Sequence, residues 1–124
     1  MSQETDVVAL RSFIPAKDFD TSFRFYQDLG FTATRLDAGI GLLQLGPFSC
    51  FLQKYHAPGF AESYMMQLLV KDLDAWWARI QSLNLPDRYA VQPPSPPKLQ
   101  PWGLRVSYVY DPDGVLWHNT QDSD

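Results

Sequence analysis

Residues 17–20 read Lys-Asp-Phe-Asp, and residues 71–74 read Lys-Asp-Leu-Asp, 54 positions further along the chain. An amphipathic helix pattern follows each copy. Its apolar residues are Phe19, Phe23, Tyr26 and Leu29 in the first copy and Leu73, Trp77, Ile80 and Leu83 in the second. We expect Asp18 and Asp72 to cap the starts of these helices, and Gly30 to end the first one. Matching sequence and helix phase at one offset predict a structural unit that occurs twice.

Strand patterns surround both helices. A β run precedes each helix, at residues 7–14 and 64–70, and three short strand-like segments follow each one. These segments are residues 31–36, 40–45 and 48–55 in the first copy and residues 88–92, 104–110 and 115–120 in the second. The sequence Asp111-Pro112-Asp113-Gly114 is typical of a hairpin turn, because Pro fixes φ and Gly supplies a positive φ.

The chain therefore predicts an α+β fold in a single domain spanning residues 1–124. Two βαβββ repeats, about 7–55 and 64–120, are expected to form a curved mixed sheet with a cleft, with the helices on the outer face. Residues 56–63 are the expected linker. Six of the ten prolines lie between residues 86 and 101, so this stretch is expected to be an extended loop. An ordered flap over the cleft is the favoured interpretation, and a disordered linker is the alternative.

Composition narrows the range of partners. The chain has 124 residues, 45% of them hydrophobic, with 14 acidic and 10 basic side chains and a net charge of -4. This balance argues against nucleic acid as a partner. No apolar run approaches the roughly 20 residues that a membrane helix needs. A single cysteine and a polar start predict a cytoplasmic protein. The 15% aromatic content exceeds what a core of this size needs.

The helix sequence Ser22-Phe23-Arg24-Phe25-Tyr26, its continuation Leu29-Gly30-Phe31 and the closing turn at residues 111–114 resemble the vicinal oxygen chelate superfamily. That superfamily contains glyoxalase I, extradiol dioxygenases and bleomycin resistance proteins, and the resemblance covers about residues 7–120. The sequence Gln100-Pro101-Trp102-Gly103, followed by a strand, the turn and a strand that carries His118, is most similar to the bleomycin resistance proteins.

Enzymes of this superfamily hold one divalent metal ion with ligands from four strands, and the resemblance assigns those positions residue by residue. They fall on Arg11, Phe51, Met65 and His118. Only the histidine suits the usual metals, and moving the register from Phe51 to Cys50 or Gln53 raises the number of ligands to two. A catalytic zinc site needs about three protein ligands. We therefore expect no metal, no other cofactor and no metal-dependent catalysis.

A cleft without a metal is expected to bind a small organic molecule. The predicted ligand-binding residues are Trp102, His118, Arg11, Phe51 and Met65. The resemblance implies that Trp102 stacks on the ligand, and an exposed aromatic on a Pro-rich loop agrees with that role. The acidic net charge suits a cationic ligand, whereas Arg11 in the cleft would favour an anionic group.

Four further residues carry expectations of their own. Trp76 is expected at a dimer surface, because it is adjacent to the core position Trp77 and cannot face the same way. Trp117 is expected to pack under a helix. Cys50 is expected to be a buried and inert side chain, with a nucleophile near His118 as the alternative. His56 is expected at the surface of the linker.

The sequence thus predicts metal-independent binding of a small, aromatic or cationic molecule by a cytoplasmic homodimer, similar to drug sequestration by bleomycin resistance proteins. One alternative is a metal-dependent lyase, isomerase or dioxygenase of the same superfamily. Another is an interaction module whose cleft is filled by its own side chains.

Overall fold

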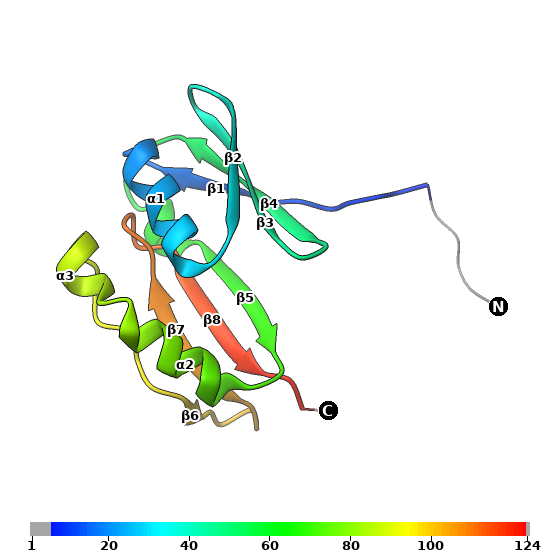
Figure 1. Cartoon of the computed structure of the whole chain (residues 1–124), viewed down its shortest axis with the longest axis vertical. Helices are drawn as coiled ribbons and strands as arrows, with labels where there is room; N and C mark the ends of the chain where they lie inside the picture. Colours follow the sequence, from blue (N-terminus) through cyan, green and yellow to red (C-terminus); the bar gives the residue numbers. More distant parts are fainter. Residues whose placement is uncertain (1–5, 124) are drawn as a thin grey trace.

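Both predicted repeats are present in the computed structural model, which describes residues 6–123. The first repeat comprises β1 (Phe13–Ala16), α1 (Phe19–Leu29), β2 (Thr32–Asp37), β3 (Ile40–Leu45) and β4 (Phe48–Lys54). A linker with a short 3-10 helix (Ala61–Ser63) leads to the second repeat, which comprises β5 (Met65–Val70), α2 (Leu73–Ser82), α3 (Leu85–Tyr89), β6 (Lys98–Leu99), β7 (Arg105–Tyr110) and β8 (Leu116–Gln121). The α+β fold is confirmed (Figure 1).

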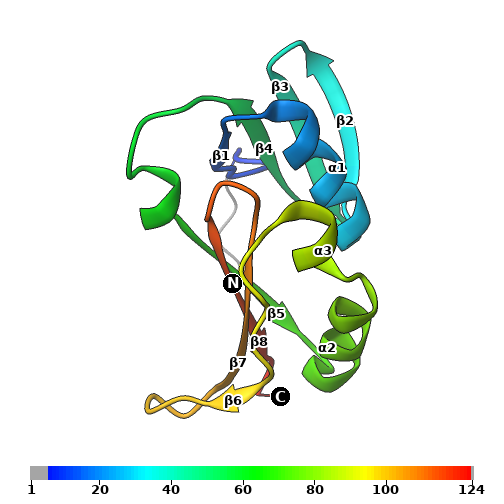
Figure 2. The same ribbon diagram turned by 90° about the vertical axis from the view of Figure 1, so that its left-hand side faces the viewer.

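Each repeat forms its own mixed sheet of four strands. The strand orders are β1-β4-β3-β2 and β5-β8-β7-β6, with the first and last strand of each repeat parallel and the other neighbours antiparallel. Figure 2 shows α2 and α3 on one side of the second sheet. Within residues 6–123, no helix is long and apolar enough to cross a membrane.

The helix starts are capped as the repeated sequence predicts. A carboxylate oxygen of Asp18 accepts from the backbone N–H of Thr21 at 3.2 Å, and Asp72 accepts from Ala75 at 3.0 Å. Gly30 ends α1 with φ of 122°, a backbone conformation that L side chains rarely adopt. Each aspartate satisfies one backbone donor that the first helical turn leaves free.

Strand register confirms how the two repeats correspond. Phe13 on β1 pairs with Phe51 on β4, and Gln67 on β5 pairs with His118 on β8. Phe13 and Gln67 are 54 positions apart, which is the offset of the repeated sequence. Phe51 and His118 are therefore equivalent residues of the two repeats.

The hydrophobic core joins the helices to the inner face of each sheet and continues from one repeat into the other. Its largest fully buried side chains are Trp117, Tyr26, Phe25, Ile14, Leu29, Leu43, Leu52, Leu73, Ile80, Leu85, Val106 and Val109. Because side chains alternate along a strand, the residues between these core positions lie on the opposite, helix-free face of each sheet.

One predicted strand begins too early and another is wrong. Residues 7–12 precede β1, which pairs with β4 from Phe13. The start of this segment extends away from the body of the protein (Figure 1), while the carbonyl of Ser12 accepts from the Phe51 N–H at 2.9 Å. Residues 88–92 begin in helix α3, whose first turn contains Pro86 and whose Arg88 N–H donates to the carbonyl of Asn84. A run of apolar residues becomes a strand only where a neighbouring strand supplies hydrogen bonds.

The Pro-rich segment is ordered but is not a flap over a cleft. The backbone N–H of Ser95 donates to the carbonyl of Tyr108 at 3.0 Å, and its hydroxyl accepts from the Tyr108 N–H at 3.1 Å. The Ser107 hydroxyl donates to the carbonyl of Ser95 at 2.7 Å. These bonds fasten the segment along β7.

Candidate ligand-binding site

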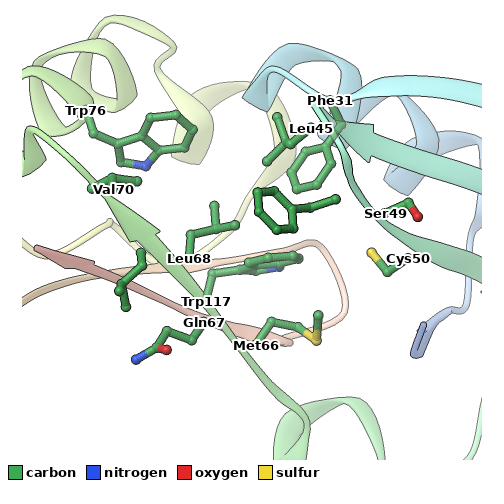
Figure 3. Close-up of a pocket in the computed structure, with 12 residues that line it drawn as sticks. Phe31, Leu45, Ser49, Cys50, Met66, Gln67, Leu68, Val70, Trp76 and Trp117 are labelled. Atoms are coloured by element: carbon green, nitrogen blue, oxygen red, sulfur yellow. The ribbon is translucent and has the colours of Figure 1, made fainter. Parts of the chain in front are cut away.

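A cavity of about 540 Å³ opens between the two repeats (Figure 3). The first repeat contributes Phe31, just before β2, together with the end of β3 and the start of β4. The second repeat contributes β5, α2 and β8. The lining residues are Phe31, Leu45, Phe48, Ser49, Cys50, Met66, Gln67, Leu68, Leu69, Val70, Trp76 and Trp117. The wall is thus apolar and rich in aromatic rings, which suits an organic ligand of moderate size.

Strand alternation in β5 gives the cavity one of its walls. Met66, Leu68 and Val70 are half-buried, while the residues between them are exposed. β5 is the edge strand of its sheet, so one side of its backbone has no neighbouring strand. The cavity is therefore open along an edge instead of enclosed by a further strand.

Trp76, which the sequence placed at a dimer surface, is part of the cavity wall. It packs against the core cluster, and the guanidinium carbon of Arg79 lies 5.3 Å from the centre of its ring. Among residues 6–123, its indole N–H is one of the few buried polar groups that find no hydrogen-bond acceptor. A buried donor without an acceptor is costly.

Trp117 lies at the bottom of the cavity and is held by a chain of hydrogen bonds. Its indole N–H donates to the Tyr26 hydroxyl at 3.0 Å, and that hydroxyl donates to Asp111 at 2.6 Å. Burial raises the pKa of Asp111 to about 6 and, together with the Asp111 charge, raises the pKa of Tyr26 well above its ordinary value. The expectation that Trp117 packs under a helix is confirmed, because Tyr26 belongs to α1.

Cys50 borders the same cavity from β4 and is buried. Burial raises the pKa of its thiol to about 11, so the thiol is protonated at neutral pH. Because the thiolate is the reactive form, Cys50 is unsuited to act as a nucleophile there.

The five ligand-binding residues predicted from sequence lie outside this cavity. In the first repeat, the Arg11 side chain donates to the Ser49 hydroxyl at 2.6 Å and its guanidinium lies 5.6 Å from the centre of the Phe51 ring. The Phe51 ring stacks on Phe13 at 4.8 Å. These four residues form a small cluster on the helix-free face of the first sheet.

The second repeat carries the equivalent cluster. The His118 Nε2 lies 3.3 Å from the sulfur of Met65, and the imidazole ring is 5.0 Å from the ring of Tyr108. Partial burial lowers the pKa of His118, so its neutral form is favoured at neutral pH. Trp102 belongs to neither cluster: it is 60% exposed in the turn between β6 and β7.

The four positions that bind metal in related enzymes do not fit a metal ion in this chain. Arg11 is positively charged, Phe51 has no ligand atom, and the thioether of Met65 is a poor ligand for zinc, manganese or magnesium. Nowhere in residues 6–123 do three His, Cys, Asp or Glu side chains gather as a metal site would require. Of the residues at the four positions, only His118 is a usual ligand for such metals.

The sequence predicts a cleft but does not identify the residues that line this cavity, because the two repeats together create it. The residues that line it come from both halves, and most of them match ordinary core patterns. The alternation of Met66, Leu68 and Val70 with exposed neighbours and the adjacent tryptophans on α2 were the available signals. Neither signal indicates where the cavity lies relative to the two repeats.

The fold, the repeat and the chemistry of these positions define a protein class. The sequence model of the Glyoxalase/Bleomycin resistance protein/Dioxygenase superfamily matches residues 7–118, and the chain belongs to this superfamily. Within it, the chain is 32% identical over 107 residues to a bleomycin resistance protein from Klebsiella pneumoniae, with 83% of each chain covered.

Solved structures support the same relationship. A bleomycin-binding protein complexed with bleomycin is similar with a TM-score of 0.78 and 29% identity, and the match covers 96% of this chain and 100% of that one. A bleomycin resistance determinant encoded on the transposon Tn5 is similar with a TM-score of 0.77 and 28% identity, covering 97% and 100% of the two chains.

Proposed function

We propose that this protein binds a bleomycin-type glycopeptide and sequesters it without chemical change. The observation that carries the proposal is an open, aromatic-lined cavity of about 540 Å³ in a chain 32% identical to a bleomycin resistance protein. Sequestration needs affinity alone, whereas the metal chemistry of the related enzymes needs ligands that this chain does not have at the corresponding positions.

Aromatic surfaces for stacking are available in several places. Phe31, Phe48 and Trp76 border the cavity, and Trp102 exposes most of its side chain in the β6–β7 turn. Stacking of a planar heteroaromatic group contributes about 0.5–1.5 kcal/mol per ring beyond the burial of its area.

The net charge of the protein favours a cationic ligand at long range, while the Arg11 side chain can contact an anionic group at short range. The net charge of -4 attracts a cationic glycopeptide toward the protein. The Arg11 side chain already donates to Ser49, yet a guanidinium has further donors. We therefore propose that Arg11 and His118 contact polar parts of the ligand on the helix-free faces of the sheets, and that Phe51 and Met65 contact its apolar parts.

The exposed apolar residues favour a homodimer. Val8 and Leu10 are 99% and 95% exposed on the N-terminal segment, and Phe13, Met65 and Leu69 are about half exposed on the helix-free faces. Large exposed apolar side chains are often covered at an interface. We propose that a cytoplasmic homodimer covers these residues. Sedimentation equilibrium tests this point: a Val8→Asp, Leu10→Asp variant is expected to be monomeric, and a monomeric parent chain would contradict it.

Calorimetric titration with bleomycin tests the function. The parent chain is expected to bind saturably, and Trp102→Ala is expected to weaken binding roughly threefold to tenfold. Phe60→Ala is the matched control, because Phe60 is also an exposed aromatic but belongs to the linker. Absence of binding would contradict the proposal, and an unchanged affinity in Trp102→Ala would contradict the role of that residue.

Metal analysis separates the proposal from its enzymatic alternative. Protein purified without chelator is expected to contain no stoichiometric divalent metal. One tightly bound divalent ion per chain would favour a lyase, isomerase or dioxygenase and would overturn the sequestration proposal.

A further inference from the structure

A phenol from one repeat connects two residues of the other. The Tyr26 hydroxyl, on α1 of the first repeat, accepts from the Trp117 indole at 3.0 Å and donates to Asp111 at 2.6 Å. Trp117 is 1% exposed and Asp111 is 2% exposed. All three side chains are therefore held in a buried chain of hydrogen bonds that crosses between the repeats.

The Asp111 carboxylate is fixed in direction by its own turn. Its Oδ1 accepts from the backbone N–H groups of Asp113 and Val115, both at 2.9 Å, which leaves Oδ2 to accept from Tyr26. The turn is also tied to the first repeat, because Asp113 accepts from the backbone N–H of Lys17 at 2.6 Å. The Asp111 carboxylate, at the end of the chain of hydrogen bonds, is thus held in a fixed orientation.

Trp117 is also part of the cavity wall, and the opposite wall belongs to the first repeat. We infer that Asp111 is a positioning residue for the ligand cavity: through Tyr26 it holds the Trp117 indole in the wall and fixes the first repeat against the second, so that ligand affinity depends on the ionisation of Asp111. This inference rests on the proposed function for its ligand, whereas the control of Trp117 by Asp111 does not.

The Asp111 carboxyl is expected to change its protonation state at a pH where the folded protein can be studied. Burial raises the pKa of this carboxyl to about 6, and Asp113 in the same turn adds a raising effect. The groups that face this region are Tyr26 on α1, Cys50 on β4 near Tyr26, and Lys17, His56 and Glu62 near Asp113. Protonation replaces the charge-assisted bond from Tyr26 by a neutral one, which is roughly half as strong. The indole is then held less firmly.

The direct test follows the Trp117 indole N–H by NMR from pH 4.5 to 8. Phe substitutions of Trp76, Trp77 and Trp102 assign the resonance while leaving Trp117 in place. The resonance is expected to shift with a midpoint near pH 6 in the parent chain and in Asp113→Asn, and to lose this transition in Asp111→Asn. Asp113→Asn is the matched control, because it removes the same charge from the same turn and leaves the contact with Tyr26 intact.

A second arm measures bleomycin affinity by calorimetry at pH 5 and pH 7.5. For each protein we compare the affinity at pH 5 with that at pH 7.5. In the parent chain and in Asp113→Asn, this ratio is expected to fall about fivefold further than in Asp111→Asn, because protonation of Asp111 weakens its hydrogen bond with Tyr26. Because bleomycin has titrating groups of its own, the difference between variants is the measured quantity. Tyr26→Phe is expected to bind weakly at both pH values, because it breaks the chain of hydrogen bonds.

Two results would overturn the inference. One is an indole transition that persists in Asp111→Asn, which would belong to the neighbouring His118. The other is a pH profile of affinity that is the same in the parent chain and in Asp111→Asn. If the parent chain does not bind bleomycin at all, the proposed function fails, and the NMR titration alone then decides whether Asp111 positions Trp117.

Discussion

The Arg79 guanidinium on α2 donates to the backbone carbonyl oxygen of Leu29, the last residue of α1, at 2.6 Å. A second donor of the same group reaches the carbonyl of Asp28 at 3.3 Å. The last carbonyl groups of a helix have no partners within it, and a positive charge at that end also interacts favourably with the helix dipole. An arginine of the second repeat therefore completes the helix of the first.

Arg79→Ala is expected to lower the free energy of unfolding by about 1–2 kcal/mol, because it removes charge-assisted hydrogen bonds and the contact with Trp76. Urea denaturation measures the effect. Arg105→Ala is the comparison: Arg105 pairs with Asp74 at 2.8 Å, but both side chains are exposed to solvent, so the change should cost far less than Arg79→Ala. Equal costs for the two variants would contradict the capping role.

Gly30→Ala should be considerably more destabilising than Gly46→Ala. Gly30 has φ of 122° and an added Cβ would lie 2.7 Å from the Arg79 guanidinium. Gly46 has φ of 56° and open space around it. We expect costs of about 3 kcal/mol and about 1 kcal/mol, respectively. Thermal unfolding of both variants checks the order, and a reversed order would show that the contact with Arg79 relaxes at no cost.

The pH dependence of stability should reveal the buried carboxyl of Asp111. Its pKa is about 6 in the folded protein, above the ordinary 3.8, so the folded protein binds this proton more tightly than the unfolded chain does. Between about pH 4 and pH 6 this group therefore lowers the free energy of unfolding as the pH rises, by about 3 kcal/mol in total. Urea titrations of the parent chain and Asp111→Asn should differ in slope over that range. Parallel profiles would contradict the raised pKa.

The Cys50 thiol should react slowly with iodoacetamide in the folded protein. It is 5% exposed, and burial raises its pKa to about 11. Mass spectrometry is expected to show little alkylation under native conditions at pH 8 and complete alkylation in concentrated urea. Rapid alkylation of the native protein would indicate that the cavity beside Cys50 admits small reagents and that the thiol is readily ionised.

Local sequence signals predicted the repeated framework well. Capping by Asp18 and Asp72, the glycine that ends α1 and the closing turn at residues 111–114 depend on side chains and backbone angles within a few residues. The same local reasoning failed where neighbours decide the structure. Residues 7–10 are apolar but form no strand, and residues 88–92 begin in a helix that packs beside α1, where Arg88 donates to Asp28.

For the candidate site too, some features followed from the sequence and others depended on how the repeats pack. The correspondence of Phe51 with His118 follows from the repeat and is confirmed by strand register. The absence of a metal at these positions remains a prediction. The roles proposed for Trp102, Arg11, Phe51, Met65 and His118 remain predictions. Trp76, by contrast, was expected at a dimer surface and lies in a cavity wall, because what its face meets depends on how the first repeat packs against α2.

By itself, then, the sequence determined a duplicated βαβββ unit, its superfamily and the mismatch at the metal positions, since all of these are encoded by residue types at fixed spacing. Only the tertiary structure decided that the repeats enclose an aromatic cavity and that Tyr26 of one repeat links Trp117 and Asp111 of the other. Contacts between residues 85 and 91 positions apart arise from the packing of two separate units, which no local pattern specifies.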